Sequence, residues 1–314
     1  MTLREAIEQF IAFRISLGSR FVSQSYELRH FLKKVDGEMA CDDVTVEQVC
    51  SYLTGEGPLT QTRAFKYTVL NTFWRYAISR GYASRSPLPD NEPRKPRSPL
   101  PYVYRQDELQ RLFQAIEVNQ KRARSIDANT LRMLLLLLYG AGLRGGEARR
   151  LRMSDVDLPE ALLTVRLSKF YKTRLVPVGP QLADALRNYA KDRASRAFPH
   201  GEESAFLANR DGKALNRYVV QTTFARLRKT AGIVHADKTV LSPTLHSLRH
   251  TFAVNRVTAW YREGADVQRL LPALSTYLGH SRLSDTQVYL SMTPELLQEA
   301  SLRFENFVSA NTGE

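Results

Sequence analysis

The chain has 314 residues, 43% of them hydrophobic and 25% charged, an ordinary globular mixture with enough residues for one large core or two moderate ones. Its 45 lysines and arginines outnumber 32 aspartates and glutamates and give a net charge of +13. Such an excess attracts polyanions, most often nucleic acid. A membrane is not favoured, because Met1 to Glu5 offers no anchor and the longest apolar stretch, Met133 to Leu143, is only eleven residues long.

The two cysteines, Cys41 and Cys50, lie among acidic and β-branched residues, with no histidine or third cysteine nearby. This pattern indicates neither a zinc site nor a disulfide framework. We expect both to be small core residues of a soluble, cytoplasmic protein that holds no metal or cofactor.

The first 83 residues predict a small helical bundle. Thr2 to Glu5 fits a capping box, and three more helices are expected at about 22–34, 45–54 and 60–79. The last of these mixes aromatic and basic residues: Arg63, Lys66, Tyr67, Trp74, Arg75, Tyr76 and Arg80. They form either a nucleic-acid face or a buried stripe backed by solvated charges, and the apolar members favour the buried stripe.

Prolines mark the next segment. Residues 84–101 hold six of the fourteen prolines, which remove backbone donors and disfavour helix in the preceding residues. We expect an extended linker at 84–103 that separates a first domain, 1–83, from a second, 104–314.

The second domain is predicted to be mainly helical with a small β-sheet. Helical patterns start at Asp107 and Leu131 and dominate again from Pro180 onward. Between them, residues 162–167 and 173–178 are short β-rich runs on either side of a lysine-containing turn, which predicts a hairpin.

A pattern of candidate functional residues lies in His246-Ser247-Leu248-Arg249-His250. Residues three and four apart are neighbours on a helix, so His246, Arg249 and His250 share one face and His246 and Arg249 can reach a single phosphate. Taken alone this pair is weak evidence, but two further segments accompany it, Gly140 to Leu151 and Leu278 to Tyr289.

In these three segments, in this order, the chain resembles the tyrosine recombinase and phage integrase family. The resemblance implies a helical, SAM-like core-binding domain at 1–83 and a catalytic domain with a C-terminal helix at 104–314, the two clamping double-stranded DNA. It implies site-specific cleavage and rejoining of DNA, in integration, excision, transposition or resolution.

The expected roles follow from what phosphoryl transfer needs. Charge gathers on the non-bridging oxygens of the attacked phosphate, where Arg144 and Arg249 can stabilise it and His280 can add a donor. Tyr289 is the expected nucleophile. A phenol of ordinary pKa, about 10, needs an acceptor for its proton, and His246 is the candidate.

The resemblance also implies a lysine on the hairpin as general acid for the departing 5′ oxygen. Ser168 to Pro177 is similar to the family's Gly-Lys-x-x-Lys-x-Arg-x-x-Pro pattern, which favours Lys169, with Lys172 as the second candidate. The resulting 3′-phosphotyrosyl bond conserves the bond energy, so that rejoining requires neither ATP nor a metal.

Three features near this set agree with the family pattern or depart from it. Glu147 matches an acidic position that supports the arginine, the alternative being a solvated surface carboxylate. Gly145-Gly146 replaces larger residues, and the segment Val267 to Tyr277 is about four residues longer than usual, which puts the local helix geometry in question.

A last helix is expected from Thr293, with apolar residues at Leu297, Ala300, Phe304, Phe307 and Val308. The resemblance implies that it is exchanged between protomers in a homo- or hetero-tetramer on two DNA sites. The alternatives are a type IB topoisomerase-like enzyme that relaxes DNA as a monomer, or a catalytically silent DNA-binding protein.

Overall fold

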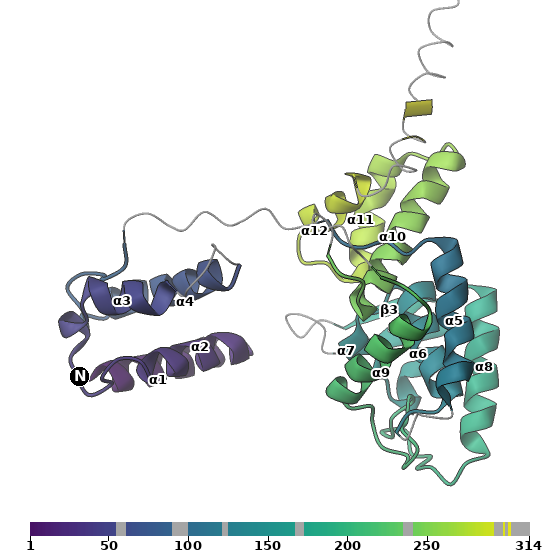
Figure 1. Ribbon diagram of the computed structural model, residues 1–314, viewed down its shortest axis with the longest axis horizontal. Helices are drawn as coiled ribbons and strands as arrows, with labels where there is room; N and C mark the ends of the chain where they lie inside the picture. The colour runs from purple at the N-terminus through teal and green to yellow at the C-terminus, as the bar shows by residue number, and fades with distance from the viewer. Residues whose placement is uncertain are drawn as a thin grey trace, which may run out of the picture. The chain divides into compact units, whose positions relative to one another are not determined.

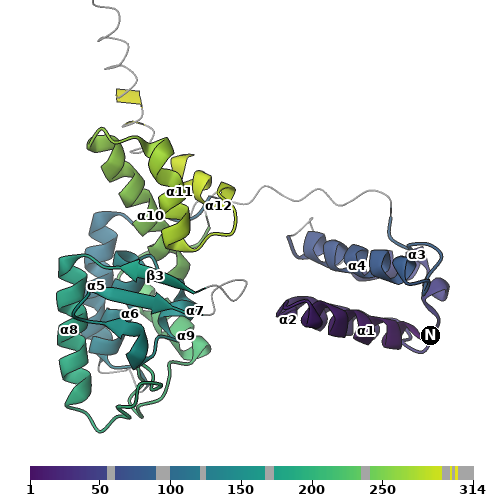
Figure 2. The ribbon, with the colours of Figure 1, turned by 180° about the vertical axis from the view of Figure 1, so that it is seen from behind.

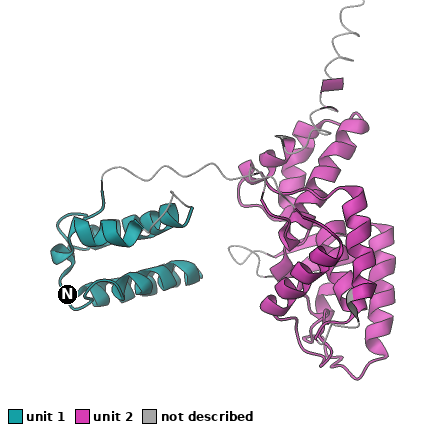
Figure 3. Ribbon diagram, in the orientation of Figure 1, with its two compact units in different colours: residues 1–98 teal, residues 99–314 magenta. Residues whose placement is uncertain are grey.

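The computed structural model describes residues 1–54, 61–89, 100–120, 125–166, 173–234 and 241–291, together with positions 298, 301 and 302. The chain divides into two compact units, Met1–Ser98 and Pro99–Glu314 (Figure 3). Each unit is described by itself. Both are mainly helical, and the described strands all lie in the second unit, which confirms the predicted fold class.

The first unit is the predicted helical bundle (Figure 1). It contains α1 (Leu3–Ser16), α2 (Val22–Leu32), the 3₁₀ turn η1 (Cys41–Asp43), α3 (Val46–Leu53) and α4 (Gln61–Ser79). The capping box is present at the start of α1, where the Thr2 hydroxyl accepts from the Glu5 amide at 3.2 Å and the Glu5 carboxylate accepts from the Thr2 amide at 3.0 Å.

The aromatic residues of α4 belong to the core of this unit. Phe73 and Trp74 are fully buried and Tyr67 is nearly so, whereas Arg75 and Arg80 are exposed. Lys66 lies over the Tyr52 ring at 4.2 Å from its centroid and 4.0 Å from the Glu27 carboxylate. The buried-stripe prediction is therefore confirmed for the apolar members, and the exposed arginines keep their charge at the surface.

The second unit begins with helices and then forms its sheet. Its first half contains α5 (Gln106–Gln120), α6 (Ala128–Gly140), α7 (Gly145–Ala148), η2 (Met153–Asp155), β1 (Val156–Asp157), β2 (Leu162–Val165) and β3 (Arg174–Pro177). The three strands pair antiparallel in the order β1-β2-β3, with Leu163 opposite Val176. The predicted hairpin is confirmed, and Figure 2 shows it beside α6 and α8.

The remaining elements of the second unit are helical. They are α8 (Pro180–Ala194), α9 (Arg217–Thr230), α10 (Leu245–Arg262), α11 (Val267–Leu278), α12 (Ser284–Gln287) and the 3₁₀ turn η4 (Val288–Ser291). The apolar stretch seen in the sequence lies in α6, which packs against α5, α8 and α10 and buries Leu134, Leu135, Leu137 and Leu138. Among the described helices, none has the length and apolar character needed to cross a membrane.

Most of the proline-rich linker and most of the expected C-terminal helix lie outside the described residues. The bounds 1–83, 84–103 and 104–314 thus stay predictions. Within the second unit, α6 and α10 are the pair that matters for chemistry, because the loop after α6 carries Arg144 and the first turns of α10 carry Arg249.

Candidate active site

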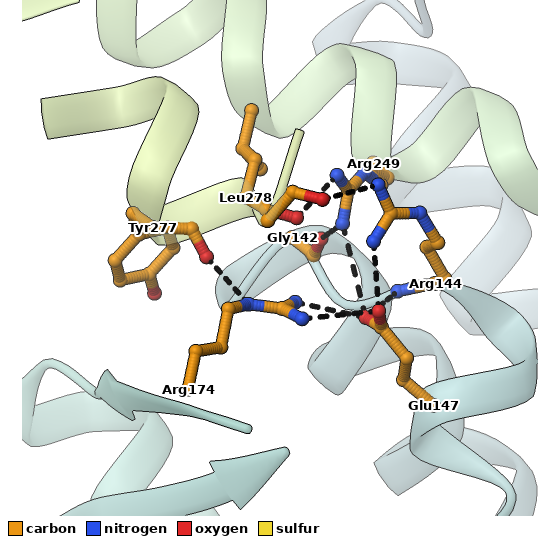
Figure 4. Close-up of polar contacts among 8 residues, drawn as sticks. Gly142, Arg144, Glu147, Arg174, Arg249, Tyr277 and Leu278 are labelled. Carbon is orange, nitrogen blue, oxygen red and sulfur yellow. Dashed lines mark hydrogen bonds and ion pairs between the residues drawn. The ribbon is translucent and has the colours of Figure 1, made fainter. Parts of the chain in front are cut away.

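The loop after α6, the start of α10 and the segment that follows α11 meet in the second unit. Figure 4 shows Arg144 and Arg249 pointing toward the last residues of α11. Tyr289, in η4, lies against α10. The structure therefore brings together Arg144, His246, Arg249, His280 and Tyr289, five of the six residues predicted to act in the reaction.

Arg249 is fully buried, which is unusual for a cation. Its Nη1 donates to the Gly142 carbonyl and its Nη2 to the Leu278 carbonyl, both at 2.7 Å. Its Nε is buried without a hydrogen-bond partner among the described residues. Burial, and then the charge of Arg144, lower the pKa of Arg249 to about 10, so the guanidinium stays charged at neutral pH.

Arg144 is held by a carboxylate and a carbonyl. It is the N-cap of α7; its Nη1 donates to Glu147 Oε1 and its Nη2 to the Gly279 carbonyl, each at 2.8 Å. Glu147 also accepts from the Arg144 amide at 2.9 Å. Glu147 is 5% exposed, so it is not a solvated surface residue, and the prediction that it supports Arg144 agrees with these contacts.

Arg174 is a member of this cluster that the sequence reasoning did not single out. Its two Nη atoms donate to the Glu147 carboxylate at 3.0 and 2.9 Å, and its Nε donates to the Tyr277 carbonyl at 2.8 Å. Burial would raise the pKa of Glu147, but Arg174 and then Arg144 outweigh it and lower that pKa to about 2. The sequence does contain a signal for this residue, because Arg174 stands at the arginine of the family's Gly-Lys-x-x-Lys-x-Arg-x-x-Pro pattern.

The nucleophile candidate Tyr289 is 2% exposed and contacts two histidines. Its phenol oxygen lies 3.1 Å from His250 Nδ1, and its ring stacks on His280 with centroids 6.1 Å apart. Burial raises the pKa of Tyr289, and the positive charge of Arg249 partly offsets that effect. The phenol is therefore protonated in the free protein and needs an acceptor.

The histidine within hydrogen-bond distance of the Tyr289 phenol is His250 rather than His246. Burial, followed by the neighbouring His246 and Arg249, lowers the pKa of His250 to about 3, so its ring is neutral at pH 7. His246 is more exposed and packs edge-on against His250, with ring centroids 4.5 Å apart. The role expected of His246 stays a prediction, whereas His250 is the histidine that hydrogen-bonds to the phenol.

The depressed pKa values predict a pH dependence of stability. The pKa values of His250 and His280, about 3 and about 4 in the folded protein, lie below the ordinary 6.5, because burial disfavours the charged rings. The unfolded chain thus binds more protons as pH falls, and we expect the melting temperature to decrease from pH 6.5 toward pH 4. Thermal melts followed by circular dichroism measure this dependence. If the melting temperature of His250→Gln falls with pH as steeply as that of wild type, His250 does not contribute.

His280 is oriented by Thr286. The Thr286 hydroxyl is fully buried and lies 2.8 Å from His280 Nδ1. Because burial keeps the His280 ring neutral, the ring carries one N–H, and a hydroxyl that donates to Nδ1 leaves that N–H on Nε2. Thr286 thus allows His280 to act as a donor through Nε2.

We expect Thr286→Val, which keeps the shape and removes the hydroxyl, to slow DNA cleavage about 10-fold to 100-fold, as loss of an orienting partner does elsewhere. Thr286→Ser should retain most of the rate because it keeps the oxygen. Single-turnover cleavage measures the effect, and equal losses in the two variants would show that the hydroxyl does not orient His280.

Gly142 occupies a position that no other residue fits. Its φ is +60°, and an added Cβ would lie 2.6 Å from the Phe252 ring and 3.0 Å from the Leu278 side chain. Its carbonyl accepts from Arg249. We expect Gly142→Ala to reduce the free energy of unfolding by about 2–4 kcal/mol, through backbone strain and overpacking. Urea denaturation measures this change. Gly264→Ala is the control, because Gly264 also has a positive φ but an added Cβ there meets no atom within 4 Å, so that only backbone strain contributes.

The segment before His280, which we expect to be about four residues longer than usual, forms one helix. α11 starts after Asp266, whose side chain accepts from the Arg269 amide, and continues past Pro272 to Leu278. Gly279 ends it with φ +67°, and this C-cap directs the chain to His280. The segment is thus helical throughout, with Pro272 inside it, and its last turn lies at the site.

Lys169 and Lys172 lie outside the described residues, so the choice between them stays a prediction. The strands before and after them in the sequence are described. β2 and β3 pair from Leu162 opposite Pro177 to Val165 opposite Arg174. Arg174, the first residue of β3, reaches the arginine cluster.

A basic pocket of about 680 Å³ adjoins His246 and the start of α7. Four arginines and no carboxylate are among its described lining residues, the arginines being Arg149, Arg150, Arg217 and Arg228. Gly145 and Gly146 also line it, so the two glycines that depart from the family pattern leave this wall without side chains. The pocket suits an anionic backbone next to the candidate active site.

Comparison with known proteins identifies the class. Residues 103–295 match the model of the phage integrase family. A putative integrase/recombinase, y4rE, of Sinorhizobium fredii is 36% identical over 96% of this chain and 95% of its own length. A tyrosine recombinase XerA of Thermococcus kodakarensis is 36% identical over 66% of this chain and 64% of its own length.

Solved structures agree in fold. The Tn1549 transposon integrase, in complex with transposon right end DNA, has a TM-score of 0.70 at 18% identity and covers 98% of this chain and 100% of its own. A lambda integrase dimer bound to a core site has a TM-score of 0.67 at 19% identity, covering 94% and 97%.

The chain belongs to the phage integrase family of tyrosine recombinases. It is a tyrosine-type, site-specific recombinase that cleaves and rejoins DNA. This class is favoured over the topoisomerase-like and catalytically silent alternatives.

Proposed function

We propose that Tyr289 Oη attacks a phosphorus atom of one strand of double-stranded DNA, forms a 3′-phosphotyrosyl bond and releases a 5′ hydroxyl. The observation that carries this proposal is the contact of the Tyr289 phenol with His250, beside the buried charge of Arg249. Attack by the 5′ hydroxyl of another strand reverses the step and restores the phenol.

The proton movements are divided between two groups. His250, whose Nδ1 lies 3.1 Å from the phenol oxygen, accepts the proton of Tyr289, and the negative charge of the bound phosphate favours the protonated ring. A lysine of the hairpin, Lys169 in preference to Lys172, donates a proton to the departing 5′ oxygen. His246, at the exposed side of His250, contacts the phosphate together with Arg249.

Negative charge on the phosphate meets a surplus of positive charge. The cluster has three guanidinium groups, those of Arg144, Arg174 and Arg249, and one carboxylate, that of Glu147, a surplus of two. Because these groups are already oriented by the protein, they stabilise the developing charge without reorganisation. Arg249 also lies next to Tyr289, so that its charge acts on the attacking oxygen as well as on the phosphate.

The experiment uses a pool of nicked DNA duplexes with a randomised segment, in which cleavage next to the nick releases a short fragment and traps the protein. We expect a covalent adduct, and tryptic mapping should place the nucleotide on the peptide that contains Tyr289. Absence of an adduct across the pool, with DNA binding intact, would overturn the proposal. The selected duplex then serves as substrate for the variants below.

We also propose assembly as a homo- or hetero-tetramer on two DNA sites, with both units clamping the duplex and with residues 293–314 exchanged between protomers. The apolar spacing from Leu297 to Val308 supports the exchange. Deletion of 293–314 should abolish synapsis of two selected duplexes in native gels, and unchanged synapsis would refute the exchange. A cytoplasmic location accords with action on the cell's DNA.

A further inference from the structure

Three arginines converge on the end of a single helix (Figure 4). The last carbonyl groups before and at the C-cap of α11, those of Tyr277, Leu278 and Gly279, each accept from a different arginine, namely Arg174, Arg249 and Arg144. The donor–acceptor distances are 2.8, 2.7 and 2.8 Å. The last carbonyls of a helix lack partners within the helix and form the negative end of its dipole, so this end of α11 attracts cations.

Arg174 differs from the other two arginines in what its nitrogen atoms contact. Nε is bonded to the Tyr277 carbonyl, and both Nη atoms are bonded to the Glu147 carboxylate in a bidentate pair. Its side chain is 10% exposed, compared with 29% for Arg144. The planar fork therefore faces Glu147 and not a substrate, and Arg174 holds groups of the protein together.

The three contacts of Arg174 connect three separate segments. The residue itself begins β3, Glu147 is in α7, and Tyr277 is in the last turn of α11. The space is tight, because a Cβ on Gly279 would lie 2.8 Å from Arg174 Nη1. Arg174 thus ties the start of β3 to Glu147 and to the end of α11.

We infer that Arg174 is a positioning residue for DNA cleavage: it fixes Glu147 and the end of α11 so that Arg144 and Arg249 are directed at the same phosphate. The inference rests on the roles proposed above for Arg144 and Arg249. The opposing view is that Arg174 only neutralises a buried carboxylate. If Arg174 only neutralises Glu147, any positive charge at position 174 is sufficient. If Arg174 is a positioning residue, its planar guanidinium and the contact of Nε with the Tyr277 carbonyl are needed as well.

Four variants separate these two views: Arg174→Met, Arg174→Lys, Glu147→Gln and the double variant Arg174→Met/Glu147→Gln. The readout is the single-turnover rate of covalent adduct formation at saturating concentrations of the selected nicked duplex. A misplacement near 1 Å can cost about 100-fold in rate, and we expect a loss of that size in Arg174→Met with DNA affinity changed less than about threefold. Arg174→Lys should recover only a small part, because an ammonium lacks the fork.

The double variant tests whether Arg174 acts through Glu147. We expect its loss to be close to the larger of the two single losses and well short of their product, as for residues that act as one unit. A rate in Arg174→Lys equal to wild type, or a double variant with multiplied losses, would overturn the inference. A rate in Arg174→Met within threefold of wild type would overturn it as well.

Arg193→Met is the matched control for a purely structural arginine. Arg193 is 1% exposed and donates to the carbonyls of Pro199 and Ala205 in the same unit, without contacting the cluster. It should lower the melting temperature at least as much as Arg174→Met while the adduct rate of the folded protein stays near wild type. An equal fall in rate in both variants would mean that general destabilisation explains the effect.

Hydrogen exchange of the free protein provides a readout that needs no DNA. The amides of Gly279 and His280 donate to carbonyls in the last turn of α11. We expect both amides to exchange faster in Arg174→Met than in wild type, and at the wild-type rate in Arg193→Met. Unchanged exchange in Arg174→Met would overturn the inference. An absent adduct in wild-type protein would instead refute the proposed function, and the exchange result would still decide whether Arg174 holds the end of α11.

Discussion

Tyr289→Phe is expected to form no covalent adduct with the nicked duplex, a loss in rate on the order of 10⁴-fold or more, as for removal of other enzymatic nucleophiles. The substitution removes the attacking oxygen and keeps the ring. Because the Tyr289 ring is 2% exposed and stacks on His280, the packing survives. The lost hydrogen bond to His250 should change stability by only about 1 kcal/mol.

The adduct is measured by its slower migration in denaturing gels, and DNA binding by a mobility shift in native gels. Tyr189→Phe is the matched control, because Tyr189 is also buried in the second unit and its hydroxyl lies 3.1 Å from that of Thr130. We expect the control to form adduct at the wild-type rate. An adduct in Tyr289→Phe would show that another residue is the nucleophile.

Arg249→Met is expected to lower the rate of adduct formation at least about 10³-fold while changing stability by less than about 2 kcal/mol. The side chain donates two charged hydrogen bonds, to Gly142 and Leu278, whose loss costs about 1.5–3 kcal/mol each. Against this, the same substitution removes a fully buried cation from a cluster with surplus positive charge, which relieves a penalty of several kcal/mol.

The loss of two hydrogen bonds and the removal of a buried charge change the free energy of unfolding in opposite directions and by similar amounts. Nothing offsets the loss of the guanidinium that stabilises the phosphate, so the rate of adduct formation should still fall. Urea denaturation and single-turnover cleavage measure the two quantities on one preparation. Arg249→Lys keeps the charge and should still lose most of the rate, because one ammonium cannot reach both carbonyls and the phosphate. A variant that loses stability and rate in parallel would mean that Arg249 is chiefly a structural residue.

Local sequence patterns were sufficient for most of the fold. The capping box at Thr2 and the two β-rich runs around the lysine turn depend on neighbouring residues, and both are present as predicted. The histidines of α10 show the limit of this reasoning. Helical spacing places His246, Arg249 and His250 on one face, but the ring that meets Tyr289 depends on how η4 packs against α10, which is a tertiary contact.

Arg174 could not be placed from the sequence for a similar reason. It is 27 positions from Glu147 and 103 from Tyr277, and no local periodicity connects residues so far apart. Arg249 was predicted as a catalytic cation, but its complete burial was not, because basic residues usually remain at the surface. Both residues break the usual preferences at the place where the chemistry is expected.

The last turn of α11 has a consequence for how this helix can vary in length. The arginines of the site bond to this helix at Tyr277, Leu278 and Gly279, and Val267, Leu271 and Leu274 bury it in the same apolar cluster as Tyr289 and part of α10. An insertion or deletion inside α11 would therefore shift the apolar contacts together with the register of the final turn. A change in the length of α11 has to preserve both the buried side chains along the helix and the position of its carbonyl end.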